Sequence, residues 1–294
     1  MASAIMELND LLTKVGIDPK NVIVMRHCPT ERELRKVLPW LAAERPDTYN
    51  AYQQCQRPAV EKAVQKADYL ASFIGHEAGK ALFIGLYRRG EFRPLTWAEY
   101  WQVPANIEMR AFGMRGFVKG ERDTALWFDL KPTDFYKDWK GRLVVDWPPP
   151  ERSWWRWADR NVIPVAAIHP QSLLDAEMPR WDELCFTWEE LKVLPAKWKA
   201  ALRQWRGIYF IFDESDGKGY VGSAYGADNI LGRWLNYAAR GHGGNKKLRK
   251  RDPAQFRFSI LQRVSPDMEP AEIIRLESSW KDRLHTRDHG MNEN

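Results

Sequence analysis

The last third of the chain holds a small set of polar side chains suited to handling a phosphate and a metal ion. Arg233 carries a planar guanidinium that matches two phosphate oxygens at once. Glu277 offers the hard carboxylate oxygen that Mg²⁺ prefers. Tyr209 and Tyr220 add two phenols, which titrate near pH ~10 and act as bases only where their surroundings lower that value. Together these groups can bind a cation, hold a phosphate and move a proton.

The order and spacing of these residues resemble the GIY-YIG nuclease family over about 206–294. The pieces that carry the resemblance are, in chain order, Gly207-Ile208-Tyr209, Tyr220-Val221-Gly222, Arg233-Trp234, Glu277 and Asn292. The resemblance implies an endonuclease that hydrolyses phosphodiester bonds of DNA with one Mg²⁺ ion, for which Mn²⁺ can substitute.

The same resemblance gives each residue a role. Glu277 would be the metal ligand, and because it is the one acid of the motif it implies a single metal ion. Arg233 would hold the scissile phosphate, and Tyr209 would be the general base. Tyr220 would position the water or a phosphate oxygen, and Asn292 would brace the site by hydrogen bonding.

Each role has a plainer alternative. Glu277 can instead form a helical ion pair with Lys281, one turn further along. Tyr209 and Tyr220 can simply pack on a face of a sheet, and Arg233 can be a solvated helix residue. The surrounding motif favours the functional roles over these alternatives.

Tyr237 departs from the usual pattern of the family. It lies four residues after Arg233, on the same face of the expected helix. Many members have histidine at this step, whereas some restriction-type members have tyrosine. The departure leaves the proton path open and favours a restriction-like enzyme. His242 is an alternative local base, equally well explained as a polar loop residue.

Basic side chains cluster just after this helix. They are Lys246, Lys247, Arg249, Lys250 and Arg251. Such a run neutralises DNA phosphates independently of sequence, although a solvated charged helix is a common alternative. Asn245, directly before the run, either bonds the DNA backbone or caps a helix.

The pattern of apolar residues predicts an α+β fold for both parts of the chain. In 206–294 it predicts a three-stranded antiparallel sheet flanked by helices, as the family resemblance implies. The expected elements are strands at 207–213, 218–223 and 256–264, and helices at 228–240, 245–251 and 266–284.

The region before 206 is expected to divide into three segments. Residues 1–67 are predicted to be helical, and 171–205 to form a helical connector with a capping box at Thr187–Glu190. Residues 68–170 are predicted to form a β-rich domain with a small barrel-like sheet. Its expected strands are 69–75, 80–88, 107–113, 124–130, 142–147 and 162–168.

The β-rich region is the natural candidate for choosing the DNA target. Its pattern loosely resembles PUA-like folds, including readers of modified bases, by analogy only. Trp154 and Trp157, beside several arginines, are predicted to edge a pocket that stacks on a base. The favoured alternative is that these tryptophans fill the core.

Composition bounds the class of protein. The chain has 294 residues, a formal charge of +6, 15 Trp and three Cys. The odd cysteine count without a CxxC pair argues against a disulfide framework or a zinc site, and the apolar runs are too short for a membrane span. We therefore expect a cytoplasmic restriction or defence nuclease acting on double-stranded DNA, as a homodimer on DNA. A repair or mobile-element nuclease and a catalytically silent DNA-binding protein are the alternatives.

Overall fold

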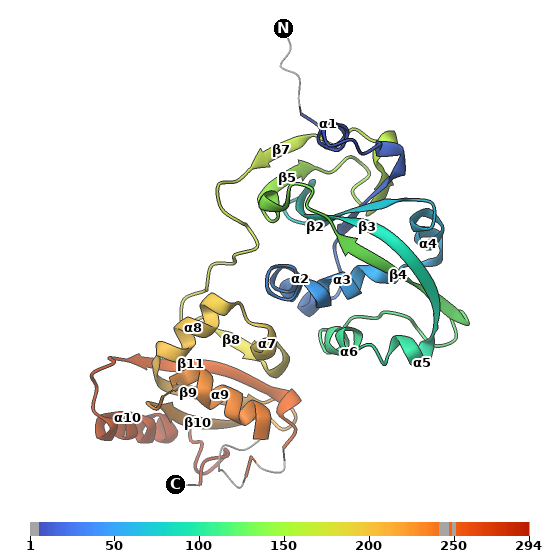
Figure 1. Cartoon of the computed structure of the whole chain (residues 1–294). Helices are drawn as coiled ribbons and strands as arrows, with labels where there is room; N and C mark the ends of the chain where they lie inside the picture. Colours follow the sequence, from blue (N-terminus) through green and yellow to red (C-terminus); the bar gives the residue numbers. More distant parts are fainter. Residues whose placement is uncertain (1–5, 228, 241–246, 249–250, 294) are drawn as a thin grey trace. The chain divides into compact units, whose positions relative to one another are not determined.

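The computed structural model describes residues 6–227, 229–240, 247–248 and 251–293. Contacts group the chain into two compact units, Met1–Ala176 and Glu177–Asn294 (Figure 1). Each unit combines a sheet with packed helices, so the predicted α+β class is confirmed. Within the described residues, no helix combines the length and apolar character needed to cross a membrane.

The first unit is built on a seven-stranded sheet with the order β6-β1-β2-β3-β5-β7, in which β4 pairs with β3. The strands are β1 (Val22–His27), β2 (Tyr69–Gly75), β3 (Lys80–Thr96), β4 (Thr124–Pro132), β5 (Leu143–Asp146), β6 (Trp155–Trp157) and β7 (Val165–Ile168). The first half of β3 pairs with β2 and β5, and its second half pairs with β4. This change of partner along β3 curls the sheet into a half-barrel (Figure 1), which confirms the barrel-like prediction.

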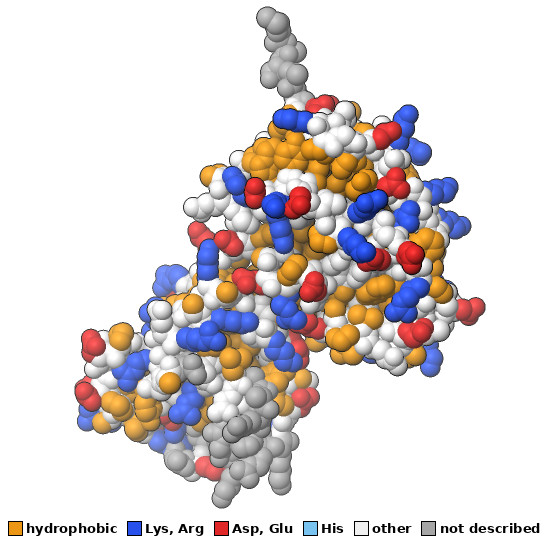
Figure 2. Space-filling view, viewed as in Figure 1, with side chains coloured by type: hydrophobic (Ala, Val, Ile, Leu, Met, Phe, Trp, Pro, Cys, Tyr) orange, Lys and Arg blue, Asp and Glu red, His pale blue; other side chains and the backbone are white. Residues whose placement is uncertain are grey.

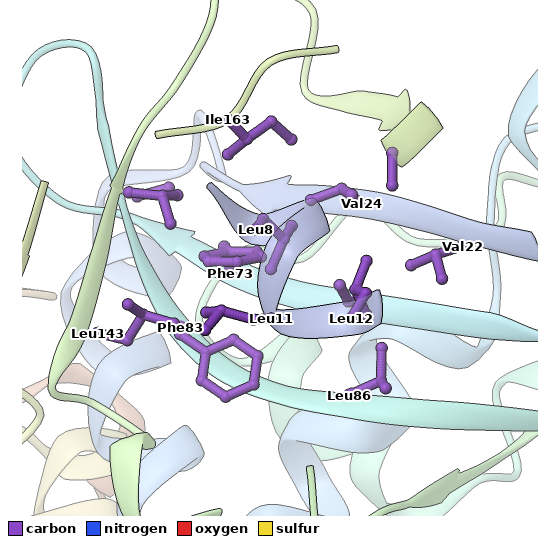
Figure 3. Packing of buried hydrophobic residues seen from close by; sticks show 14 of the residues in the cluster. Leu8, Leu11, Leu12, Val22, Val24, Phe73, Phe83, Leu86, Leu143 and Ile163 are labelled. Atoms are coloured by element: carbon purple, nitrogen blue, oxygen red, sulfur yellow. The ribbon is translucent and has the colours of Figure 1, made fainter. Parts of the chain in front are cut away.

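Helices cover both faces of this sheet. They are α1 (Leu8–Lys14), α2 (Arg32–Glu44), α3 (Pro46–Gln54), α4 (Pro58–Val64), α5 (Trp97–Tyr100) and α6 (Pro104–Arg110). On one face, Leu8 and Leu12 of α1 pack with Val24, Phe73 and Phe83 of the sheet (Figure 3). On the other face, α4 packs on a second cluster. Burial on both faces explains why the strands are so apolar.

Two elements of this unit differ from the sequence prediction. Residues 1–67 are not wholly helical, because β1 lies within them and runs parallel to β2. All six residues of β1 are buried, so the strand lacks the alternation that would have revealed it. The strand predicted at 107–113 is wrong: α6 occupies most of it, beginning with Pro104 in the first helical turn.

The second unit has a four-stranded antiparallel sheet with the order β10-β9-β11-β8. Its strands are β8 (Cys185–Thr187), β9 (Arg206–Asp213), β10 (Lys218–Ala224) and β11 (Phe256–Val264). Its helices are α7 (Trp188–Val193), α8 (Ala196–Gln204), α9 (Asn229–Arg240) and α10 (Pro270–Arg283). On one face, Ile273 of α10 packs against Ile208 and Val221. On the other, Trp234 of α9 lies on Phe258. The sheet is therefore covered on both sides.

The fourth strand of this sheet comes from the segment predicted as a helical connector. β8 pairs with residues 257–259 of β11. It leads directly into α7, where the predicted capping box forms. The Thr187 backbone N–H donates to Glu190 at 2.8 Å, and the Glu190 N–H donates to the Thr187 hydroxyl at 3.0 Å. This segment is thus a helix pair plus a short strand that extends the sheet.

Candidate active site

Three tyrosines converge on one face of the second sheet. Tyr209 lies on β9, Tyr220 on β10 and Tyr237 on α9. Their ring centroids are 5.7 to 6.4 Å apart. The Tyr209 hydroxyl donates a hydrogen bond to the Tyr237 hydroxyl at 3.2 Å, and both side chains are almost wholly buried. The structure therefore brings together three of the residues predicted for the site.

The glycines of the motif make room for this cluster. Gly222 on β10 is paired with Tyr209 on β9. A Cβ atom at Gly222 would lie 2.4 Å from the Tyr209 hydroxyl oxygen, and one at Gly207 would lie 2.1 Å from the backbone oxygen of Gln262. Both positions are closer than any side chain permits, so glycine is needed for the ring and the strand to lie as they do.

Gly222→Ala is expected to displace Tyr209, lower the cleavage rate at least about tenfold and reduce the free energy of unfolding by about 1–3 kcal/mol, the usual cost of overpacking. Gly226→Ala is the matched control, because nothing lies within 4 Å of a Cβ there. Urea unfolding and plasmid cleavage measure the two effects. Equal behaviour of the two variants would contradict a packing role for Gly222.

Burial makes the two motif tyrosines weak acids. It raises the pKa of Tyr209 well above its ordinary value, and the neighbouring phenols of Tyr237 and Tyr220 raise it further. Burial likewise raises the pKa of Tyr220, with Tyr237 and the carboxylate of Glu277 adding to the effect. The guanidinium of Arg233 lowers both values. Either phenol therefore needs a nearby positive charge to lower its pKa before it can act as a base.

The carboxylate of Glu277 on α10 is held at both oxygens. The Ser223 hydroxyl on β10 donates to Oε2. The Lys281 ammonium pairs with Oε1 at 2.8 Å, and both side chains of this pair are largely buried, at 13% and 16% exposed. The ion pair that the sequence offered as an alternative is therefore formed. It keeps the carboxylate in one place beside β10.

Ser223 is a site residue that the sequence interpretation missed. It directly follows the Tyr220-Val221-Gly222 motif, and its side chain is nearly buried. In a strand, residues two apart share a face, so Ser223 lies on the same face as Val221, which α10 covers. That alternation is the signal that could have placed it near Glu277.

The predicted site residues come from both faces of the sheet and lie near its edge. The tyrosines lie on the face covered by α9, whereas Glu277 reaches Ser223 from the face covered by α10. β10 is the outermost strand on this side of the sheet. The charges of Arg233 and Glu277 both act on Tyr220. Among the described residues, the half-buried side chain of Arg233 makes no hydrogen bond or ion pair.

Asn292 fastens the C-terminal segment to β10. Its side-chain oxygen accepts from the Val221 N–H at 2.9 Å, and its amide nitrogen donates to the Val221 carbonyl at 2.8 Å. Met291 adds a backbone hydrogen bond to the Gly219 carbonyl. These bonds hold the strand residue next to Tyr220, so Asn292 braces β10 beside the tyrosine cluster.

The structure describes part of the predicted DNA-contacting segment. Arg251 bonds Asp216 through both terminal nitrogens at 2.8 Å and also reaches Asp213. These bonds lower the pKa of Asp216 to about 2. The Lys247 ammonium donates to the Asn292 carbonyl at 3.0 Å. The other predicted contacts lie outside the described residues: His242, Asn245, Lys246, Arg249 and Lys250.

A cavity of about 560 Å³ opens beside this segment. It is lined by Lys218, Lys247, Arg251, Asp288, His289, Gly290 and Met291. Basic groups outnumber the one acid in the lining, although nearby Asp216 offsets part of the charge. Figure 2 shows Lys and Arg side chains interleaved with Asp and Glu over the visible surface.

Trp154 and Trp157 belong to the first unit, away in sequence from the tyrosine cluster. Both are half-buried and pack against the cluster that contains Ile23, Leu70 and Phe128. They therefore pack on the sheet, as the favoured alternative predicted, and each keeps a partly exposed ring.

A family model described as the GIY-YIG catalytic domain matches residues 206–292. A mutant form of the catalytic domain of intron endonuclease I-TevI is 27% identical, with 31% of this chain and 94% of that chain covered and a TM-score of 0.27. A structure of the catalytic domain of homing endonuclease I-TevI is 28% identical, with 30% and 98% covered and a TM-score of 0.26. No curated protein matches significantly.

The family match covers the residues whose geometry is described above. It begins with β9, spans the tyrosine cluster and Glu277, and ends at Asn292, which fastens β10. Residues 206–292 form a GIY-YIG catalytic domain, and the chain is a nuclease.

Proposed function

We propose that the protein is a DNA endonuclease that depends on Mg²⁺, for which Mn²⁺ substitutes, and that it serves in restriction or defence. The observation that carries the catalytic part is the geometry at the edge strand β10, where Tyr220 packs beside Tyr209 and Tyr237 and Ser223 bonds the carboxylate of Glu277. Glu277 raises the pKa of Tyr220 and Arg233 lowers it. A cation held by Glu277 and a phosphate held by Arg233 would therefore share one small site.

The donor set fits Mg²⁺. This ion keeps several of its waters and is commonly bound by one or two carboxylates. Glu277 supplies one fixed carboxylate, and in the described part of the chain no three His, Cys, Asp or Glu side chains gather as a metal-binding group. A single carboxylate suits a hydrated, oxygen-loving cation. When bound, Mg²⁺ supplies Lewis-acid stabilisation of the charge on the phosphate oxygens.

The protein residues would divide the remaining tasks. Arg233, without a protein partner among the described residues, would hold the scissile phosphate through its planar fork. Tyr209 directs its own proton at Tyr237, which leaves its oxygen lone pairs able to accept from a water. To take a proton from that water Tyr209 would have to be a phenolate, and the positive charge of Arg233 favours the phenolate because it lowers the pKa that burial has raised. Tyr220 would orient the water or a phosphate oxygen.

Non-specific DNA contacts would come from the basic groups beside the site. Lys218, Lys247 and His289 line the cavity next to the segment that Asn292 fastens. Ammonium groups neutralise phosphates without regard to sequence and release counterions, so binding should weaken steeply with salt. Arg251, held by two aspartates, would position this segment instead of contacting DNA itself.

Target choice is assigned to the first unit. A nuclease domain of this size has little surface left to read sequence, while the first unit supplies a curled sheet with partly exposed tryptophans such as Trp154 and Trp157. These rings would stack on a base, including a modified one. The tyrosine at position 237 supports the restriction role. Two protomers on a two-fold symmetric duplex would cut both strands.

Cleavage of supercoiled plasmid by the purified full-length protein tests this proposal. We expect conversion to nicked or linear DNA with Mg²⁺ or Mn²⁺, and none with EDTA. The same plasmid prepared with and without modified cytosines tests target choice, and a preference for one of them supports the first unit as reader. Intact plasmid under all metal conditions, from folded protein that still binds DNA, would favour a catalytically silent binding protein.

A further inference from the structure

The ion pair between Glu277 and Lys281 differs from the other charged pair on the same helix. Arg275 and Glu272 of α10 are 3.7 Å apart, with side chains 75% and 52% exposed, so solvent screens their attraction. Lys281 lies 2.8 Å from the Glu277 oxygen, and both side chains are largely withdrawn from water. Coulomb interactions are much stronger in such a setting. The pair therefore affects the negative charge of Glu277 as well as the stability of the helix.

Lys281 stands where a metal ion would also have to approach. One oxygen of the Glu277 carboxylate accepts from Ser223 and the other pairs with the ammonium. A divalent cation bound to this carboxylate would meet the positive charge of Lys281 at close range. Two cations that share one carboxylate in a poorly solvated site repel each other strongly.

We infer that Lys281 is a positioning residue that competes with the divalent metal ion for Glu277. In the DNA-free protein the ammonium neutralises the carboxylate and keeps it beside Ser223. Metal binding then requires the ammonium to swing away on its flexible stem. This lowers the metal affinity of the protein without DNA. A DNA phosphate gives the displaced ammonium another anionic partner, so metal and DNA bind with positive coupling.

This inference rests on the proposed role of Glu277 as the metal ligand. It goes further by giving Lys281 a role in controlling when the metal ion binds. The test measures binding of Mn²⁺ alone to the full-length, DNA-free protein, by the electron paramagnetic resonance signal of free Mn²⁺. It does not depend on cleavage, so it separates metal affinity from catalysis.

Lys281→Met and Lys281→Gln remove the charge, and both are expected to bind Mn²⁺ about 5- to 150-fold more tightly than the wild type, the usual range of coupling between two sites. Lys281→Arg keeps the charge and should bind as weakly as the wild type. Arg275→Met removes one positive charge from an exposed pair of the same helix and should leave the affinity nearly unchanged. Thermal melting followed by circular dichroism establishes that each variant is folded.

The double variants Glu277→Gln with Lys281→Met or Lys281→Gln distinguish failure of the proposed competition from failure of Glu277 as the metal ligand. If Mn²⁺ binding depends on Glu277 but Lys281→Met and Lys281→Gln bind no more tightly than the wild type, the competition is refuted and the metal ligand stands. If Mn²⁺ binding is the same with and without Glu277 in every background, the metal ligand and the competition both fail. Tighter binding by the charge-free variants, lost on adding Glu277→Gln, supports the inference.

Discussion

Glu277→Gln is expected to abolish Mg²⁺-dependent cleavage while leaving the protein folded and most of its DNA affinity intact. The amide keeps the shape of the side chain and an oxygen for the Ser223 hydroxyl, but it loses the negative charge that would hold the cation. Contacts from Lys and Arg to DNA phosphates do not depend on this carboxylate. Plasmid cleavage measures the rate, and a gel-shift titration measures DNA affinity.

The variant also leaves Lys281 without its partner, and this has a separate effect on stability. A largely buried hydrogen-bonded charge that loses its partner costs about 1–3 kcal/mol, so a lower melting temperature is expected. Glu272→Gln is the matched control on the same helix, because its ion pair is exposed. It should cleave and melt as the wild type does. Cleavage by folded Glu277→Gln within a few-fold of the wild-type rate would refute Glu277 as the metal ligand.

Arg233→Ala is expected to lower the cleavage rate by about 10²–10³-fold, the usual effect of removing one donor to a developing negative charge. The substitution also removes the positive charge that lowers the pKa of Tyr209 and Tyr220, so both phenols become harder to deprotonate. Arg233→Lys should remain strongly impaired, because a point charge cannot copy the planar fork. Single-turnover rates across a pH series measure both effects.

Arg203→Ala is the control for this experiment, since Arg203 is an exposed residue of α8 in the same unit. It should alter binding slightly and the single-turnover rate hardly at all. Recovery of near wild-type rates in Arg233→Lys would show that charge alone suffices. An Arg233→Ala protein as active as Arg203→Ala would remove Arg233 from the site.

The catalytic unit was largely predictable because its motif is local. Tyr209 and Tyr220 lie on two strands joined by a short turn, so their spacing in sequence fixes their register in the hairpin. Tyr237 follows Arg233 by one helical turn and therefore faces the same way. The partners of Glu277 were harder to predict. Lys281 is one helical turn away and was foreseen, whereas Ser223 lies on another element and depends on how α10 packs.

The errors in the first unit have clear physical causes. β1 is buried on both faces, and its apolar residues, Val22–Met25, form an unbroken run that shows no strand period. α6 contains Ile107, which is half exposed, and Met109, and the alternation of these two with polar residues suggests a strand. Only the proline at its start indicated a helix. In both places the packing of distant elements, and not local preference, decides the structure.

The short strand β8 has a consequence for where the nuclease domain can be separated from the rest of the chain. The family match starts at residue 206, yet residues 185–187 pair with β11. A fragment that begins at 206 would leave that side of β11 as a bare edge, with backbone N–H and C=O groups open to pairing by another molecule. Such edges template aggregation. Residues 185–187 therefore protect the edge of the catalytic sheet against self-association.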